Sequence, residues 1–154
     1  MATTSPATHR STSRVEAVAP ASPPMAARHF AARLAFETDP SDLAADLAAG
    51  IEGVVVVDGR QPHGYAASRI PGAINLPHAT IDEHTTAHLD PTALYVTYCW
   101  GPACNASTRT AANLAGLGFR VKELIGGLSA WQAEGFAVDG DPTSTEHGPV
   151  ACAC

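Results

Sequence analysis

The chain has 154 residues, with 15 acidic and nine basic side chains and a formal charge of −6. This length suits one domain, since domains most often contain about 100–150 residues. The sequence has no basic stretch and no apolar run of about 18 residues, which argues against nucleic-acid binding and against a membrane span. It shows no signal-peptide pattern, so we expect a cytoplasmic protein whose thiols stay reduced.

Both ends of the sequence are predicted to lie outside the folded domain. Residues 1–25 are rich in Ser, Thr, Ala and Pro, and prolines such as Pro23 and Pro24 argue against a helix there. Residues 139–154 are rich in Gly, Pro and small polar residues. We therefore expect one domain over residues 26–138, between a disordered N-terminal tail and a flexible C-terminal tail.

The pattern changes at Met25, where apolar residues at helical spacing predict an amphipathic helix that ends near Glu37. A second helix is predicted between Asp39, which would be its N-cap, and Gly50, which would end it. The valine run at 54–57 is typical of a parallel strand that is buried on both faces.

The rest of the domain alternates strands with helices. Strands are predicted at 73–76, 94–98 and 121–125, and helices at 65–68, 106–117 and 128–134. Residues 78–91 are polar and irregular, and we expect a small helix and a loop there. Alternation of this kind predicts an α/β fold with a parallel sheet.

One loop carries the residues that indicate chemistry. Cys99 directly follows the strand 94–98, and a loop with Gly and Pro leads from it to a helix. Parallel sheets bind ligands at the carboxyl ends of their strands, and N–H groups of a tight loop and a helix N-terminus stabilise an anion. A thiolate at Cys99 would thus be a nucleophile whose bound group is held by the loop. The expected substrate-binding loop residues are Trp100, Gly101, Pro102, Ala103, Asn105, Ala106 and Ser107.

Several segments around this loop recur in a recognisable order. They include a strand that ends in Asp-x-Arg, an Ile-Pro-Gly-Ala turn and a Gly-Gly-x-x-x-Trp pattern. The segments are 56–60, 65–75, 98–99, 126–131 and 135–138. Their order and spacing resemble those of single-domain rhodaneses, sulfurtransferases that carry a persulfide on the loop cysteine.

The resemblance extends over roughly residues 30–138. It implies a three-layer α/β fold with a mainly parallel central sheet of about five strands and helices on both faces. It also implies sulfur transfer from thiosulfate or a small or protein persulfide to cyanide or a thiol. That reaction needs no metal and no organic cofactor.

The active loop departs from the family pattern, which is Cys-x-x-x-x-Arg followed by Ser or Thr. Aligned from the following helix, Ala106 stands at the arginine position and Ser107 at the hydroxyl position, and the loop is longer than usual. No cation lies between Cys99 and Arg109, so the loop would attract thiosulfate less than a loop with Arg or Lys.

Three charged residues are expected to support the loop. Asp58 and Arg60 follow a buried strand and can hold neighbouring loops through charge-assisted hydrogen bonds. A purely structural pair without a catalytic part is the favoured interpretation of these two. Arg109 lies on the helix after the loop, and its distance from the pocket cannot be judged from spacing.

The second loop thiol leaves the identity of the nucleophile open. Residues 104–110 themselves fit Cys-x-x-x-x-Arg-Thr, although Cys104 would then lie away from the strand end. We prefer Cys99 as the nucleophile. Cys104 would then attack a Cys99 persulfide or sulfenic acid and form a disulfide, or would be a passenger thiol.

Two other function classes are alternatives, and the sequence argues against the first of them. Phosphatases and arsenate reductases on this fold need Cys-x-x-x-x-x-Arg, and this sequence has Asn105 or Thr110 at the arginine position. A non-catalytic binding or regulatory module is the alternative to an enzyme. Cys152 and Cys154, with His147 nearby, offer too few ligands for a zinc site, so we expect an exposed tail.

Overall fold

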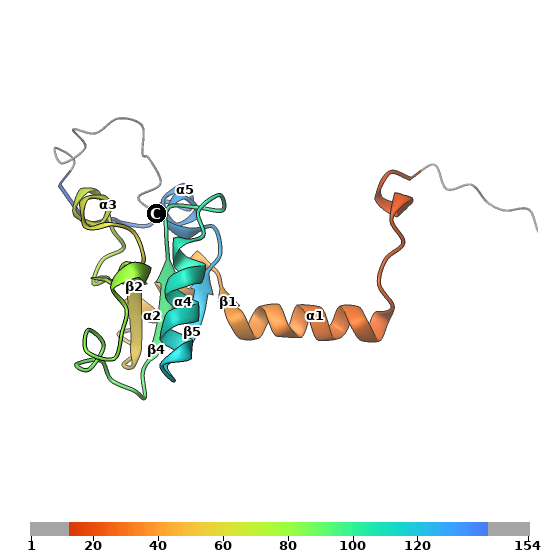
Figure 1. Ribbon diagram of the computed structural model, residues 1–154. Coiled ribbons are helices and arrows are strands. Elements are labelled where there is room, and N and C mark those ends of the chain that lie inside the picture. Colours follow the sequence, from red (N-terminus) through yellow and green to blue (C-terminus); the bar gives the residue numbers. More distant parts are fainter. Residues whose placement is uncertain (1–12, 142–154) are drawn as a thin grey trace, which may run out of the picture. The chain divides into compact units, whose positions relative to one another are not determined.

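The computed structural model describes residues 13–141. The chain divides into two compact units, Met1–Arg33 and Leu34–Cys154. In the first unit, the short 3-10 helix η1 (Val15–Ala17) precedes most of helix α1 (Pro23–Phe36), and neither element contains a buried residue (Figure 1). No helix within the described residues has the length and apolar character needed to cross a membrane.

Helix α1 begins inside the segment that was expected to be disordered. Pro23 and Pro24 occupy its first turn, where a missing N–H breaks no helical hydrogen bond. The first helical bond runs from Ala26 N to Ser22 O at 2.9 Å. The prediction that the prolines exclude a helix here was wrong for that reason. The apolar side chain of Phe30, which suggested an amphipathic helix, is exposed.

Five parallel strands form the central sheet, in the order β1-β5-β4-β2-β3. They are β1 (Glu37–Thr38), β2 (Val54–Asp58), β3 (Ile74–Asn75), β4 (Leu94–Tyr98) and β5 (Arg120–Leu124). The predicted α/β fold with a parallel sheet is confirmed. Strand β1 was not predicted, because two residues are too few to show the alternation that identifies a strand.

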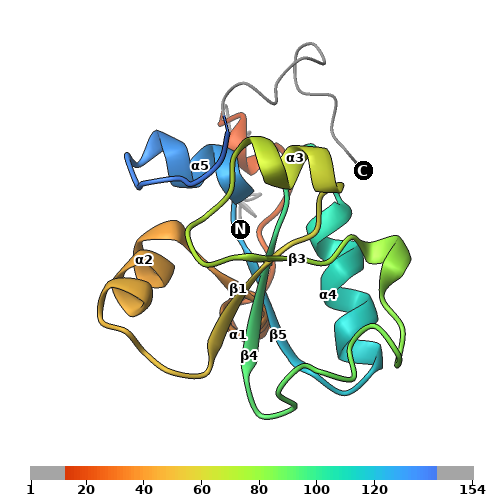
Figure 2. The same cartoon turned by 90° about the vertical axis from the view of Figure 1, so that its left-hand side faces the viewer.

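Helices cover both faces of this sheet, as expected. Helices α2 (Pro40–Ala48) and α5 (Gly127–Ala133) pack on one face, and α4 (Ala106–Gly116) packs on the other (Figure 2). Successive strand residues point to opposite faces, so Val56 belongs to the core under α2 and α5, and Val57 belongs to the core under α4. The helix α3 (Pro62–Ala67) and the 3-10 helix η2 (His78–Thr80) flank β3 in the chain.

The register of the central strands places the chemistry-bearing residues together. Asp58 at the end of β2 pairs with Tyr98 at the end of β4. Gly59 N then donates to Tyr98 O at 2.9 Å. The segments that follow these two strands, one with Arg60 and one with Cys99, therefore start at the same edge of the sheet.

Candidate active site

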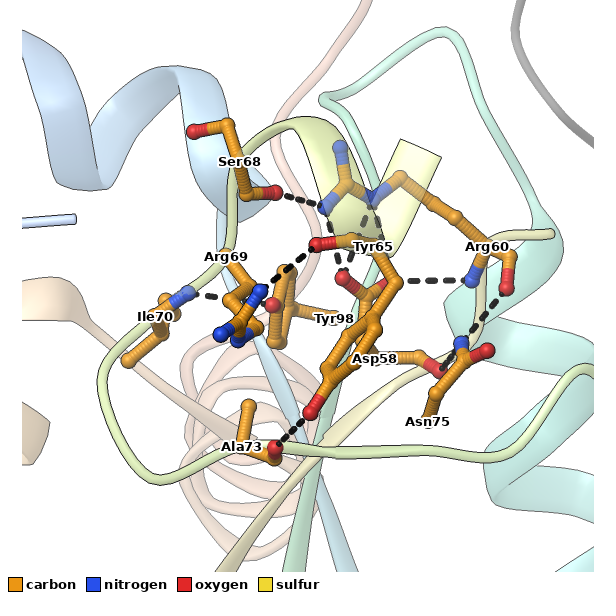
Figure 3. Close-up of polar contacts among 9 residues, drawn as sticks. All are labelled: Asp58, Arg60, Tyr65, Ser68, Arg69, Ile70, Ala73, Asn75 and Tyr98. Carbon is orange, nitrogen blue, oxygen red and sulfur yellow. Dashed lines mark hydrogen bonds and ion pairs between the residues drawn. The ribbon is translucent and has the colours of Figure 1, made fainter. Parts of the chain in front are cut away.

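A buried ion pair fixes the end of β2. Asp58 and Arg60 are almost completely buried, and Arg60 Nη2 lies 2.6 Å from Asp58 Oδ2. Arg60 Nε donates to Asp58 Oδ1 at 2.9 Å, and Arg60 N donates to the same oxygen at 2.9 Å (Figure 3). The expectation that this pair forms charge-assisted hydrogen bonds is confirmed.

The guanidinium of Arg60 also holds the loop before β3. Arg60 Nη2 donates to Ser68 O, and Asn75 Nδ2 donates to Arg60 O at 2.8 Å (Figure 3). Burial opposes the charge on Arg60, but the hydrogen bond and charge of Asp58 outweigh it, so the pKa of the guanidinium is raised. The buried guanidinium of Arg60 therefore holds neighbouring parts of the fold together.

Tyr98, the residue before Cys99, is tied to the same network. Arg60 lies over its ring at 5.7 Å, and Ile70 N donates to its hydroxyl oxygen at 3.1 Å. Burial, and then the charge of Asp58, raises the pKa of the Tyr98 hydroxyl, which stays neutral. The strand end that presents Cys99 is thus held by packing and by paired polar groups.

The start of helix α5 holds the loop from the other side. Leu128 N donates to Cys99 O at 2.9 Å. Gly127 has φ +57°, and a Cβ atom on it would lie 2.5 Å from Cys99 O. Glycine at this position therefore lets the backbone of α5 pass close to the loop. Trp131, on the same helix, is buried in the core.

The loop folds back on itself through a tight turn. Cys104 N donates to Gly101 O at 3.0 Å, and Pro102 takes the second position, where its fixed φ favours a turn. Gly101 packs close to α5, since a Cβ atom on it would lie 2.7 Å from Ser129 Oγ. This turn accommodates the extra length of the loop and brings the second cysteine back to the first.

The two thiols lie together in the interior. Cys99 and Cys104 are 2% and 9% exposed, form a cluster with Ala106, and are not joined by a disulfide. Cys99 Sγ lies 3.1 Å from Cys104 O. Burial raises the pKa of the Cys104 thiol and Cys99 adds to this, while the N–H groups of Ala106 and Trp100 oppose it.

Ser107 connects the first thiol to a carboxylate. Its Oγ lies 3.3 Å from Cys99 Sγ and 2.6 Å from Glu123 Oε1 on β5. Thr108 Oγ1 donates to the same carboxylate oxygen at 2.9 Å. Because a hydroxyl has one proton, Ser107 donates to only one of its two neighbours at a time. Sequence reasoning missed Glu123, because nothing in the spacing of β5 indicates that this residue faces the loop.

A cavity of about 490 Å³ is lined by both thiols, Ser107, Glu123 and Glu37. Of the predicted loop residues, four others also line it: Gly101, Pro102, Ala103 and Asn105. Trp100 instead packs against the core, and Ala106 is fully buried. Arg109 is exposed and does not line the cavity. Within the described residues, the cavity lining contains no Lys, Arg or His.

The sequence predicted no metal site, and it offered one group of possible ligands, near the C-terminus. In residues 13–141, no three His, Cys, Asp or Glu side chains are placed to hold a metal ion. Cys152, Cys154 and His147 lie outside the described residues. The predicted domain limits, 26 and 138, stay a prediction.

Comparison with known proteins identifies the family of this chain. The model of the family "Rhodanese-like domain" matches residues 40–134. Thiosulfate sulfurtransferase GlpE of Pseudomonas entomophila is 42% identical over 89 residues, which are 56% of this chain and 78% of that protein. The HTH-type transcriptional regulator Rv0324 of Mycobacterium tuberculosis is 35% identical over 86 residues, 56% of this chain but 38% of that protein.

A solved structure agrees with this assignment. The BH2092 protein of Bacillus halodurans superposes with a TM-score of 0.75 at 47% identity, over 79% of this chain and 88% of that chain. The family match extends over most of the compact unit that begins at Leu34. The chain therefore belongs to the rhodanese-like domain family.

Proposed function

We propose that this chain is a sulfurtransferase that carries a persulfide on Cys99 and passes its outer sulfur to a thiol or to cyanide. The family match and the similarity to a protein named thiosulfate sulfurtransferase support this reaction class. The observation that carries the assignment is the position of Cys99. Its thiol directly follows β4, lines the cavity and contacts Ser107 in the first turn of α4.

Cys99 is the better carrier of the two loop thiols. It follows a strand end that is fixed by Tyr98 and Arg60, so its position is defined by the core. Its Sγ also contacts a hydroxyl that can donate to a thiolate when the carboxylate of Glu123 does not hold the proton.

The reaction consists of two displacements at the outer sulfur. The Cys99 thiolate attacks the outer sulfur of the donor, forms an S–S bond and displaces the rest of the donor as an anion. An acceptor thiolate or cyanide then attacks the outer sulfur of the Cys99 persulfide and releases the Cys99 thiolate. Each displacement is balanced in atoms and electrons, so the chemistry can proceed on side chains alone.

A persulfide of a small thiol or of a protein fits this cavity better than thiosulfate. Glu123 lines the cavity, and no cation lines it within the described part of the chain. The buried guanidinium of Arg60 is engaged with Asp58 and Ser68 instead. A dianion would therefore be repelled by Glu123 with no cation to offset the repulsion, whereas a donor that carries a positive group would not.

Activity measurements on matched variants test the proposal. The wild type, Cys99→Ser and Cys104→Ser are compared with thiosulfate, with a small persulfide and with a phosphate ester. We expect sulfur transfer to fall to background in Cys99→Ser and to survive in Cys104→Ser. The reverse pattern would assign the carrier to Cys104, and hydrolysis of the phosphate ester would overturn the reaction class.

A regulatory module is the second candidate. The observation that favours it is the similarity to a protein named as a transcriptional regulator, in which the matching segment is a minor part. The thiols that line the cavity favour catalysis in this chain. Absence of turnover with every donor, together with stable uptake of one sulfur atom, would favour the module.

A further inference from the structure

We infer that Cys104 ejects the outer sulfur of a Cys99 persulfide as sulfide, so that the loop can reduce a persulfide as well as carry it. This inference rests on the proposed persulfide at Cys99. It adds a second outcome for the bound sulfur: transfer to an external acceptor, or release as hydrogen sulfide by the neighbouring thiol.

The first argument is proximity. The turn from Gly101 to Cys104 returns the second cysteine to the first, and Cys99 Sγ lies 3.1 Å from Cys104 O. The two side chains form one buried cluster with Ala106 and both line the cavity. An internal nucleophile is therefore in place before any acceptor enters.

The second argument is access to the two sulfur atoms of the persulfide. The inner sulfur is Cys99 Sγ itself, on a residue that is 2% exposed. An acceptor from solvent would meet the outer sulfur first, whereas Cys104 is adjacent to the inner one, since its carbonyl oxygen lies 3.1 Å from Cys99 Sγ. The sulfur that is attacked decides the product, because attack on the inner sulfur leaves the outer sulfur as the leaving group.

The third argument is the polar surrounding of Cys104. The N–H groups of Ala106, at the start of α4, and of Trp100 act on its sulfur and favour the thiolate. Burial works against them in the resting protein. The two N–H groups stabilise the negative charge on the Cys104 sulfur as it loses its proton and attacks, and the hydrosulfide that leaves takes up a proton.

The step is balanced without an external oxidant. The Cys104 sulfur forms a bond to Cys99 Sγ, the bond between Cys99 Sγ and the outer sulfur breaks, and the outer sulfur leaves as hydrosulfide with the bonding electron pair. The Cys104 proton goes to the leaving hydrosulfide and gives hydrogen sulfide. The product is a Cys99–Cys104 disulfide, and two equivalents of a small thiol, or one dithiol, reduce it to the starting state.

The test follows one bound sulfur atom. The full chain with Cys152→Ser and Cys154→Ser, which removes the two cysteines outside the described residues, is the parent. It is loaded with cysteamine persulfide, rapidly separated from small molecules, and followed without an acceptor. We expect sulfide to appear in an amount equal to the bound sulfur, together with a disulfide between the two loop cysteines.

The matched variants are Cys104→Ser and Cys104→Ala on the same parent. Both should keep the sulfur on Cys99 and release sulfide at least about ten-fold more slowly. Release at the parent rate in both variants, or a parent that holds its persulfide without forming a disulfide, would overturn the inference. Failure of both variants and the parent to take up sulfur would instead refute the proposed persulfide at Cys99.

Discussion

Two buried polar regions lie at the carboxyl ends of β2 and β4, and they differ in where the positive charge is placed. In the first region, Arg60 is paired with Asp58 and contacts Ser68 and Tyr98. In the second, Cys99 and Cys104 line a cavity whose charged lining residues, in the described chain, are glutamates. The comparison teaches that the buried cation stabilises the scaffold, while the reactive loop relies on thiols, a hydroxyl and N–H groups.

The largest expected effect concerns the scaffold region. Arg60→Met should lower the free energy of unfolding by about 3–5 kcal/mol, because Asp58 would stay buried without its partner. Urea denaturation measures this change. Arg109→Met, at an exposed position of α4, is the control and should change stability by less than about 0.5 kcal/mol. An equal loss in Arg109→Met would show that the destabilisation does not come from the buried ion pair.

The next effect concerns the contact between α5 and the loop. Gly127→Ala should destabilise the fold by about 1–3 kcal/mol and also lower activity, because the new Cβ would meet Cys99 O at a positive φ. Gly116→Ala is the control, since a Cβ there meets nothing within 4 Å, and it should stabilise the protein by up to about 1 kcal/mol. Thermal unfolding and the transfer assay together check both changes. A Gly127→Ala protein with normal activity would show that the loop does not depend on this contact.

Removing a negative charge from the cavity should change the preference between sulfur donors more than the overall rate. Glu123→Gln keeps an oxygen for Ser107 but removes a negative charge, so kcat/KM for thiosulfate should rise about five-fold at low salt. The value for cysteamine persulfide, whose ammonium group offsets its negative charge, should rise less. Glu134→Gln, at an exposed site outside the cavity, should change neither value. An equal rise for both donors would contradict the electrostatic explanation.

The smallest expected effect concerns the hydroxyl beside the thiol. Ser107→Ala removes the contact with Cys99 Sγ and should lower kcat/KM about four-fold. Thr108→Val removes the other hydrogen bond to Glu123 without touching Cys99, so its change should stay within about two-fold. If both variants lose activity equally, the carboxylate orientation matters and the contact with the thiol does not.

Most of the fold prediction came from local sequence patterns, such as the regular spacing of apolar residues. The valine run of β2 and the Gly-Pro loop before α4 were recognisable because burial on both faces and a helix start leave local patterns. Strand β1 was not predicted, since its two residues, Glu37 and Thr38, form a strand only through pairing with β5 and show no local sequence pattern. Helix α1 began earlier than expected, because Pro23 is tolerated in a first turn.

The part of the candidate site that lies on one loop could be predicted from the sequence. Cys99, Cys104 and Ser107 were identified from their place between a strand and a helix, and they do line one cavity. Glu123 could not be found, because its contact with Ser107 joins residues of separate elements through the parallel register of β4 and β5. Arg109 was grouped with the site as a supporting residue on the helix after the loop, and its side chain is exposed on α4 and does not line the cavity.

The central claim is that Cys99 carries the sulfur, and locating one added sulfur atom by fragment mass spectrometry tests it most directly. Cys99→Ser and Cys104→Ser are each loaded with cysteamine persulfide and analysed before any acceptor is added. The account predicts one extra sulfur atom on Cys99 in Cys104→Ser and none on the loop of Cys99→Ser. An extra sulfur on Cys104 in Cys99→Ser, with none on Cys99 in the other variant, would contradict it.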